Sequence, residues 1–229
     1  MKNLTELKDK IGINFKNKNV LHNVFIHRSY LNENKHFALP SNEKLEFLGD
    51  SVLSLITSMY LYTNYPTLEE GDYTEIKAAI VRTESLAEAA KNLNLGDFLA
   101  LSNGQDREAG RENKNILADC FEALIAAIFI DQGFQKAFDF VLQYLFSTKL
   151  DYIVKNKLYL SPKSRLQEYT QAHYKMIPHY QVEEEKGPEH ERIYKISVFI
   201  NKKKAGVGLG KSKKEAEEKA AKNALEKLT

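Results

Sequence analysis

The 229-residue sequence has little of three features that would each indicate a particular class of protein. It contains one cysteine, Cys120, so no disulfide can form within the chain, which suits a reducing compartment and predicts a cytoplasmic location. Its longest strongly apolar stretch, 123–130, is far too short to cross a bilayer, and no apolar block typical of a signal peptide follows Lys2. Its six histidines show no spacing typical of a metal site. We therefore expect neither a disulfide-rich secreted domain nor a membrane protein.

Charge is plentiful in the sequence but unevenly distributed. The net charge is only +2, yet residues 156–229 hold 16 Lys and Arg against 10 Asp and Glu, while residues 1–155 hold 17 against 21. Basic side chains that bind phosphates gain free energy because counterions are released from the polyanion. The distribution indicates a polyanion-binding region beside an acidic one, although two solvated surfaces with a chance split would look the same.

The first part of the chain has the periodicity of successive helices. Apolar residues recur at helical spacing over 45–59, before a breaker at 64–66, and again over 76–81 and 84–93. The segment 117–130 is apolar on nearly every side, so this helix must lie inside a bundle. The polar, glycine-containing segment 103–113 is expected to be a loop. The pattern predicts an all-α domain over residues 1–152.

The pattern changes after a linker that we place at 153–160. Ser161 and Pro162 predict a helix start, with that helix running to about residue 174. Alternating residues predict strands at 179–184, 194–200 and 205–207, with a turn at 187–189 between the first two. An alanine-rich helix is expected over 211–228. We therefore predict a multidomain protein in which an all-α domain precedes a small α+β domain, α-β-β-β-α, at 161–229.

Two groups of acidic residues stand at helical spacing. Glu43, Glu46 and Asp50 are at i, i+3 and i+7, so they project from one helix face and repel one another unless a cation lies between them. By itself this pattern is more often a solvated face. Asp119 and Glu122 form a second pair inside the apolar helix, where an uncompensated charge costs roughly several kcal/mol. Both groups together favour a metal site in a helical bundle, and oxygen ligands suit Mg²⁺, with Mn²⁺ a plausible substitute.

These residues lie in segments with a specific resemblance to a known family. The segment 42–53, Asn-Glu-Lys-Leu-Glu-Phe-Leu-Gly-Asp-Ser-Val-Leu, resembles the signature of the ribonuclease III family, and 117–125 is similar to its second acidic motif. The segments 26–30 and 69–72 also match in order and approximate spacing, so the resemblance covers essentially the whole chain. One departure is the Ala126-Ala127 pair, where the family usually has at least one glycine. This departure removes no carboxylate.

The resemblance implies an endoribonuclease that cleaves double-stranded RNA with Mg²⁺, leaves 5′-phosphate and 3′-hydroxyl ends, and matures ribosomal and messenger RNA. It implies a homodimer in which each subunit cuts one strand. Phe47 occupies the signature position that packs against the other subunit, although ordinary core packing accounts for this side chain at least as well. The residues that the resemblance assigns are Glu46, Asp119, Glu122 and Asp50 to the metal, and Asp50, Glu122 and Glu43 to catalysis.

The order helix-strand-strand-strand-helix, with a basic last helix, resembles the double-stranded-RNA-binding domain. Such a module recognises the shape of A-form RNA and its phosphates and reads little sequence. Lysines at the start of the last helix oppose its dipole, and a phosphate partner removes that conflict. The candidate RNA contacts are Lys163, Gln167 and Glu168 in the first helix, His190 in the turn, and Lys211, Lys213 and Lys214 at the last helix.

Three further alternatives bear on the function. The segment 205–212 superficially resembles a nucleotide-binding P-loop, but Ala205 stands where that motif requires glycine, so we expect no nucleotide cofactor. A non-catalytic RNA-binding dimer would have no reason to keep a costly cluster of carboxylates. A structural helical bundle would leave the basic domain unexplained. The sequence therefore favours a double-strand-specific endoribonuclease.

Overall fold

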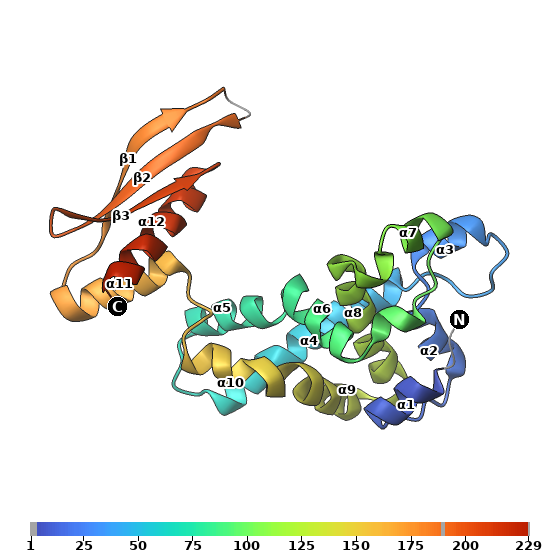
Figure 1. Ribbon diagram of the computed structural model, residues 1–229. Coiled ribbons are helices and arrows are strands. Elements are labelled where there is room, and N and C mark those ends of the chain that lie inside the picture. The colour runs from blue at the N-terminus through green and yellow to red at the C-terminus, as the bar shows by residue number, and fades with distance from the viewer. Residues whose placement is uncertain (1–3, 189–190, 229) are drawn as a thin grey trace. The chain divides into compact units, whose positions relative to one another are not determined.

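The computed structural model describes residues 4–188 and 191–228. The chain divides into two compact units, Met1–Tyr159 and Leu160–Thr229 (Figure 1). The linker predicted at 153–160 begins inside a helix, because the last helix of the first unit ends at Lys155.

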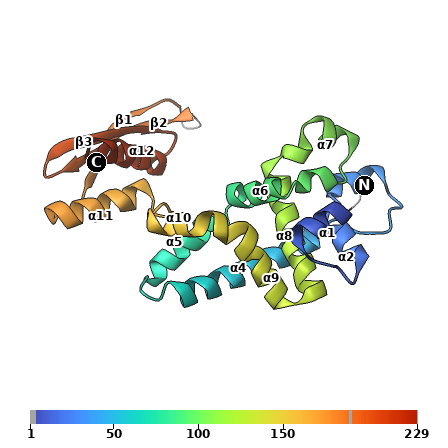
Figure 2. The same cartoon turned by 60° about the horizontal axis from the view of Figure 1, so that its bottom comes forward.

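The described part of the first unit is built from helices, as expected. α4 and α8 are its two longest helices, and they pack against each other while α6 also packs on α8 (Figures 1 and 2). In the described residues no helix is long and apolar enough to cross a membrane. The helical segments are α1 (Thr5–Ile11), α2 (Lys18–Val24), α3 (Arg28–Glu33), α4 (Glu43–Asn64), α5 (Glu70–Ile80), α6 (Thr83–Asn92), η1 (Leu95–Phe98), α7 (Asn103–Arg107), η2 (Gly110–Glu112), α8 (Lys114–Gln132), α9 (Phe134–Val141), η3 (Leu142–Phe146) and α10 (Ser147–Lys155).

Helix α8 lies at the centre of the bundle, which confirms the expectation from its apolar sequence. Every side chain from Ala123 to Ile128 is fully buried. Asn113 caps its start, because the side-chain oxygen accepts hydrogen bonds from the backbone N–H groups of Asn115 and Ile116 at 2.9 and 3.3 Å. A buried helix with a fixed start gives its two acidic residues defined positions.

The loop predicted at 103–113 is wrong, because this segment contains helix α7 and the short 3₁₀ helix η2. Ser102 caps α7 by accepting a hydrogen bond from the backbone N–H of Gln105 at 3.2 Å. Arg111 holds the segment in place, since its guanidinium pairs with Asp106 at 2.7 Å and donates to the carbonyl of Leu99 at 2.9 Å. Tertiary contacts thus order a stretch whose glycines favour a loop.

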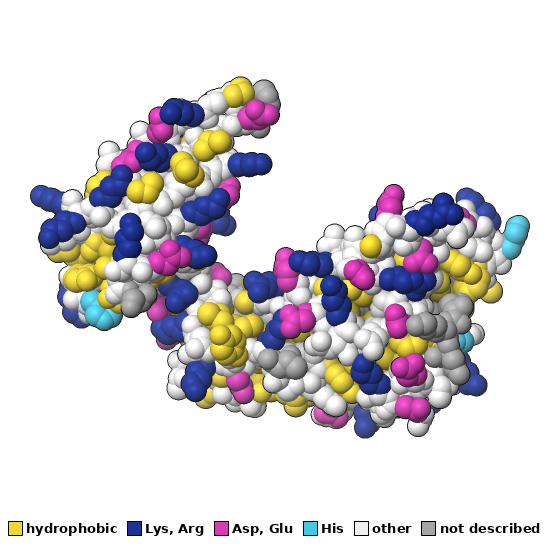
Figure 3. All heavy atoms as spheres, in the orientation of Figure 1, with side chains coloured by type: hydrophobic (Ala, Val, Ile, Leu, Met, Phe, Trp, Pro, Cys, Tyr) yellow, Lys and Arg dark blue, Asp and Glu magenta, His cyan; other side chains and the backbone are white. Residues whose placement is uncertain are grey.

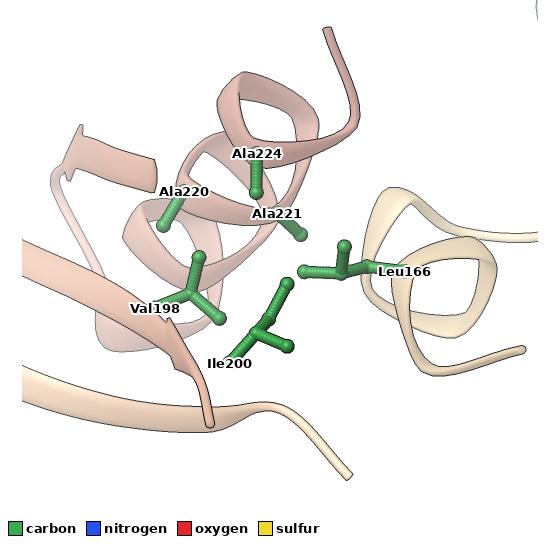
Figure 4. Close-up of a cluster of buried hydrophobic side chains, with 6 residues drawn as sticks. All are labelled: Leu166, Val198, Ile200, Ala220, Ala221 and Ala224. Atoms are coloured by element: carbon green, nitrogen blue, oxygen red, sulfur yellow. The ribbon is translucent and has the colours of Figure 1, made fainter. Parts of the chain in front are cut away.

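The second unit is a three-stranded antiparallel sheet with two helices. Its elements are α11 (Pro162–Tyr174), β1 (His179–Lys186), β2 (Ile193–Ile200), β3 (Lys203–Gly210) and α12 (Lys213–Leu228), and the strand order is β1-β2-β3. The third strand is eight residues long, so the sequence prediction of a short strand at 205–207 underestimated its length. Its core, shown in Figure 4, is made by Leu166, Val198, Ile200, Ala220, Ala221 and Ala224.

Small residues let α12 lie directly on β3. A Cβ atom added at Gly208 would be 2.1 Å from the backbone oxygen of Ala216, well inside contact distance. The glycines of β3 and the alanines of α12 therefore determine how closely the helix approaches the sheet.

Candidate functional site

The acidic site is built where α4 crosses α8. The two helices pass so close at Gly49 that an added Cβ atom would lie 1.9 Å from the backbone oxygen of Glu122. Gly49 is itself buried. Because the backbones almost touch here, Glu46, one turn before Gly49 on α4, lies close to Asp119 and Glu122 of α8.

Three of the predicted metal ligands form one cluster. Carboxylate oxygens of Glu46, Asp119 and Glu122 all lie within 4.8 Å of one another, and each side chain is half-buried. Two helices that are far apart in the sequence supply these three groups, Glu46 from α4 and the others from α8. The described residues thus contain the acidic convergence that the spacing predicted.

Burial and like charges disfavour ionisation of the carboxyl groups in the cluster. Burial, followed by the charges of Asp50, Asp119 and Glu46, raises the pKa of Glu122 to about 8. Burial also raises the pKa of Glu46 and that of Asp119, and the charge of Asp119 adds to the effect on Glu46. Arg28 acts in the opposite direction on both of these groups. The three carboxyl groups therefore resist simultaneous ionisation unless positive charge is supplied.

The other two predicted acidic residues lie beside the cluster and not within the 4.8 Å group. Asp50 is exposed, and its charge contributes more than any other charge to the raised pKa of Glu122, so the two carboxyl groups lie near each other. Glu43 is also exposed, accepts a hydrogen bond from the Ser41 hydroxyl at 2.7 Å, and lies 3.7 Å from Nη1 of Arg28. Both side chains therefore border the cluster on its exposed side.

A cavity of about 480 Å³ opens beside the cluster. Its walls include Glu43, Glu46 and Asp119, together with residues that the sequence did not single out as candidates. Arg28 lies in the 26–30 segment that the resemblance noted without assigning it a role. Polar side chains supply most of the rest of the wall, namely His27, Ser29, Asn32, Asn42, Gln105, Asn113 and Asn115.

The donor set of the cluster fits a hard divalent cation. Carboxylate oxygens are the ligands that such ions prefer, and the charge of a cation would offset the repulsion that raises the three pKa values. Cys120, next to Asp119 in sequence, is fully buried and its thiol pKa is raised by burial, so it offers no thiolate ligand.

Phe47 does not pack in the core. Its side chain is 78% exposed, which excludes the core-packing alternative within this subunit. Three more apolar residues of α4, Leu55, Met59 and Tyr62, are also exposed. We refer to these three residues and Phe47, all exposed on α4, as the apolar stripe.

The second unit presents basic side chains at the start of α12, and Lys and Arg are numerous on its visible surface (Figure 3). Lys211, Lys213 and Lys214 are all exposed. Ser212 orders this helix start by accepting a hydrogen bond from the backbone N–H of Glu215 at 3.1 Å. Lys213 Nζ lies 5.7 Å from the centre of the Tyr194 ring, and the exposed lysines are accessible to the phosphates of a bound RNA.

The remaining residues predicted to contact RNA differ in their exposure and in their contacts within the domain. Gln167 and Glu168 are exposed on α11. Lys163 contacts its own domain, because its amino group pairs with Glu217 at 2.5 Å and lies 4.9 Å from the centre of the Tyr180 ring. His190 lies outside the described residues.

Comparison with known proteins agrees with both halves of this description. Residues 17–149 match the family described as "Ribonuclease-III-like", and residues 162–228 match the "Double-stranded RNA binding motif". A "Ribonuclease 3" of Chloroflexus aurantiacus is 43% identical over 97% of this chain and 90% of its own length. A "Ribonuclease 3" of Oceanobacillus iheyensis is 43% identical over 97% of this chain and 96% of its own length.

A solved structure shows the same fold for the first unit. The nuclease domain of ribonuclease III from Campylobacter jejuni has a TM-score of 0.60 and 35% identity, covering 64% of this chain and 99% of that domain. The matched segments include the acidic cluster and the basic helix start. The chain therefore belongs to the ribonuclease III family of double-strand-specific endoribonucleases, with a helical nuclease domain followed by a double-stranded-RNA-binding domain.

Proposed function

We propose that this endoribonuclease hydrolyses RNA phosphodiesters with Mg²⁺ held by Glu46, Asp119, Glu122 and Asp50, leaving 5′-phosphate and 3′-hydroxyl ends. The observation that carries the proposal is the convergence of three carboxylates from two helices within 4.8 Å. Mn²⁺ can substitute, because it prefers the same oxygen ligands.

Each acidic residue has a distinct part in this proposal. Glu46, Asp119 and Glu122 hold the cation from the half-buried side, Asp50 is its ligand on the exposed side, and Glu43 completes the site. A bound divalent cation supplies two effects, a lowered pKa of water and neutralisation of charge on the phosphodiester oxygens. We assign Asp50, which is exposed and close enough to raise the pKa of Glu122, to hold the attacking water, and Glu43 accepts a hydrogen bond from the Ser41 hydroxyl.

The second unit binds duplex RNA. We assign phosphate contacts to Lys211, Lys213 and Lys214, and groove contacts to Gln167 and Glu168 of α11. Lys163 and His190 belong to the same proposed surface, Lys163 after release from its pair with Glu217. Recognition of shape more than sequence suits structured precursors of ribosomal and messenger RNA. A cytoplasmic location, predicted from the presence of a single cysteine, Cys120, is part of the proposal.

The functional form that we propose is a homodimer in which each subunit cuts one strand. The nuclease domain of the Campylobacter jejuni enzyme has a structurally flexible region that is involved in dimer formation. In this chain the apolar stripe Phe47, Leu55, Met59 and Tyr62 is exposed along α4. Large exposed apolar patches commonly mark protein–protein interfaces, and a second copy of the stripe would cover it.

Phe47→Asp is expected to weaken the dimer. A charge buried in an apolar interface costs at least about 2 kcal/mol, equivalent to a roughly 30-fold rise in the dimer dissociation constant. Sedimentation equilibrium measures this constant directly. Tyr152→Asp on α10 is the matched control, since Tyr152 is 65% exposed and lies outside the stripe. An unchanged dissociation constant for Phe47→Asp would place the interface elsewhere.

Mg²⁺ binding is expected to depend on pH. The raised pKa of Glu122, about 8, means that its proton must leave before the carboxylate can bind a cation. The affinity for Mg²⁺ should therefore rise by up to about tenfold per pH unit between pH 6 and 8, as for one proton released per ion, and level off above that. Calorimetry in two buffers of different ionisation enthalpy measures both the affinity and the proton release.

The same shift predicts the direction of a stability change. Because the folded-state pKa of Glu122 lies above its unfolded value of about 4.5, the folded state binds the extra proton, and metal-free stability should fall as pH rises from 4.5 to 8. Saturating Mg²⁺ should remove that fall. A Mg²⁺ affinity that stays constant across pH 6–8 would contradict the assignment of Glu122 as a ligand.

Incubation with a long duplex RNA and either Mg²⁺, Mn²⁺ or EDTA tests the function as a whole. We expect shortened products with the two metals and none with EDTA. Labelling of products before and after phosphatase treatment identifies the 5′ ends. A stable shifted complex without products would instead support the non-catalytic RNA-binding function.

A further inference from the structure

Arg28 occupies a distinctive position beside the acidic cluster. Among the described residues that line the 480 Å³ cavity, it is the one Lys or Arg side chain. Glu46 and Asp119 line the same cavity, and the charge of Arg28 acts on both. A guanidinium therefore shares a solvent-accessible space with two of the carboxylates assigned to the metal.

The ion pair of Arg28 leaves the guanidinium available for another partner. Its Nη1 lies 3.7 Å from Oε1 of Glu43, longer than the roughly 2.7–2.9 Å of a charge-assisted hydrogen bond. The Arg28 side chain is 73% exposed. The other carboxylate oxygen of Glu43 accepts a hydrogen bond from the Ser41 hydroxyl at 2.7 Å. Such a loose, exposed pair contributes little to stability, so structural need does not account for the position of Arg28.

The backbone that carries Arg28 is firmly anchored. The His27 side chain accepts a hydrogen bond from the backbone N–H of Ser29 at 3.2 Å, and Ser29 Oγ accepts one from the backbone N–H of Ser102 at 3.0 Å. The backbone N–H of His27 also donates to Ala100 at 3.2 Å. These bonds tie residues 27–29 to the chain around residue 100. Arg28 thus projects from a fixed base towards the cavity.

The other walls suit a sugar–phosphate chain. Asn32, Gln105 and Asn115 contribute neutral amides, which can donate to phosphate and ribose oxygens and accept from 2′-hydroxyls. One guanidinium among neutral donors, next to a cation site, can bind a phosphate through a two-pronged contact. A cavity lined by acids alone would repel the RNA backbone.

We propose that Arg28 binds the phosphate of the strand being cut, within this cavity, and stabilises the negative charge that grows on its oxygens during hydrolysis. This inference rests on the proposed function, since it places the scissile strand beside the metal ligands. The competing explanation is that Arg28 only neutralises the carboxylates until a cation replaces it.

The two explanations predict different effects of Mg²⁺ concentration on the cleavage rate of Arg28→Ala. Single-turnover cleavage of a duplex RNA is measured for the wild type, Arg28→Ala and Arg28→Lys over a Mg²⁺ titration. For a phosphate contact, the Arg28→Ala rate should stay about 10²-fold below wild type at saturating Mg²⁺, as for loss of one preorganised charge-stabilising group. Arg28→Lys should recover part of the loss, because it retains the charge and lacks the guanidinium fork.

Two binding measurements accompany the rates. Calorimetric Mg²⁺ binding should be as tight as in the wild type or tighter for Arg28→Ala, because a positive charge next to the site has been removed. Arg82→Ala is the matched control, since Arg82 is an exposed arginine that lies 4.0 Å from Glu84 and is not among the residues lining the cavity. Its Mg²⁺ affinity and its cleavage rate should both equal those of the wild type.

The inference would be overturned if Arg28→Ala cleaved at the wild-type rate at high Mg²⁺, or at every Mg²⁺ concentration. Weaker Mg²⁺ binding that accounts for the whole loss of rate would overturn it too. A wild-type protein that fails to cleave duplex RNA would refute the proposed function itself, which is a separate result.

Discussion

Replacement of Glu122 by Gln is expected to abolish cleavage of duplex RNA while RNA binding stays nearly unchanged. The substitution keeps the size of the side chain and removes a charged oxygen ligand from the three-carboxylate cluster. Loss of one charge-stabilising group costs roughly 10²–10³ in rate, and a lost ligand also weakens the bound cation, so the decrease should reach or exceed the upper figure. RNA binding depends mainly on the second unit and should persist.

Cleavage by Glu122→Gln is measured under single-turnover conditions, and binding is measured separately by gel shift in EDTA. Glu84→Gln on α6 makes the same chemical change at an exposed position and should retain wild-type cleavage. The metal-free Glu122→Gln protein should also be more stable than the wild type above pH 8, because it no longer carries a half-buried carboxylate among like charges. If RNA binding collapses along with cleavage, the division of labour between the two units is wrong.

Gly49→Ala is expected to damage both stability and metal binding. The new Cβ atom would lie 1.9 Å from the backbone oxygen of Glu122, and no side-chain rotation can relieve a clash with backbone. The two helices would have to move apart, at a cost of about 1–3 kcal/mol or more for an overpacked core. Because Glu46 belongs to α4 and Glu122 to α8, the carboxylate oxygens of these two residues would move apart with the helices.

Urea unfolding and Mg²⁺ calorimetry measure the two effects of Gly49→Ala. Gly71→Ala is the matched control, because Gly71 also lies in a helix but a Cβ atom there would meet nothing within 4 Å. That control should be neutral or stabilise the protein by up to about 1 kcal/mol, since alanine has the higher helix propensity. Equal stability of the two variants would show that the α4–α8 contact tolerates separation.

Local signals in the sequence predicted much of the fold. The breaker at 64–66 predicted the end of α4, which the structure places at Asn64. Ser161 and Pro162 predicted the start of α11, where the Ser161 hydroxyl accepts a hydrogen bond from the backbone N–H of Ser164. Such features act over one or two turns of chain, so they can be read without knowledge of distant residues.

Segments held by distant contacts were predicted less well. The helices of the 103–113 segment are stabilised by hydrogen bonds that Arg111 donates to the carbonyls of Gly96 and Leu99. No local sequence pattern encodes those contacts. The length of β3 depends on pairing with β2 through a register that shifts between Val198 and Phe199. The exposure of Phe47 likewise depended on which face of α4 the bundle left uncovered.

The sequence by itself determined which carboxylates could meet, because helical spacing puts Glu43, Glu46 and Asp50 on one face and Asp119 and Glu122 on another. Only the tertiary structure decided that Glu46, Asp119 and Glu122 share one cluster, with Asp50 and Glu43 beside it. It also decided that Arg28 and the amides of the cavity wall stand next to them. Spacing along a helix is set by backbone geometry, whereas distance between helices is set by packing, here by the absence of a side chain at Gly49.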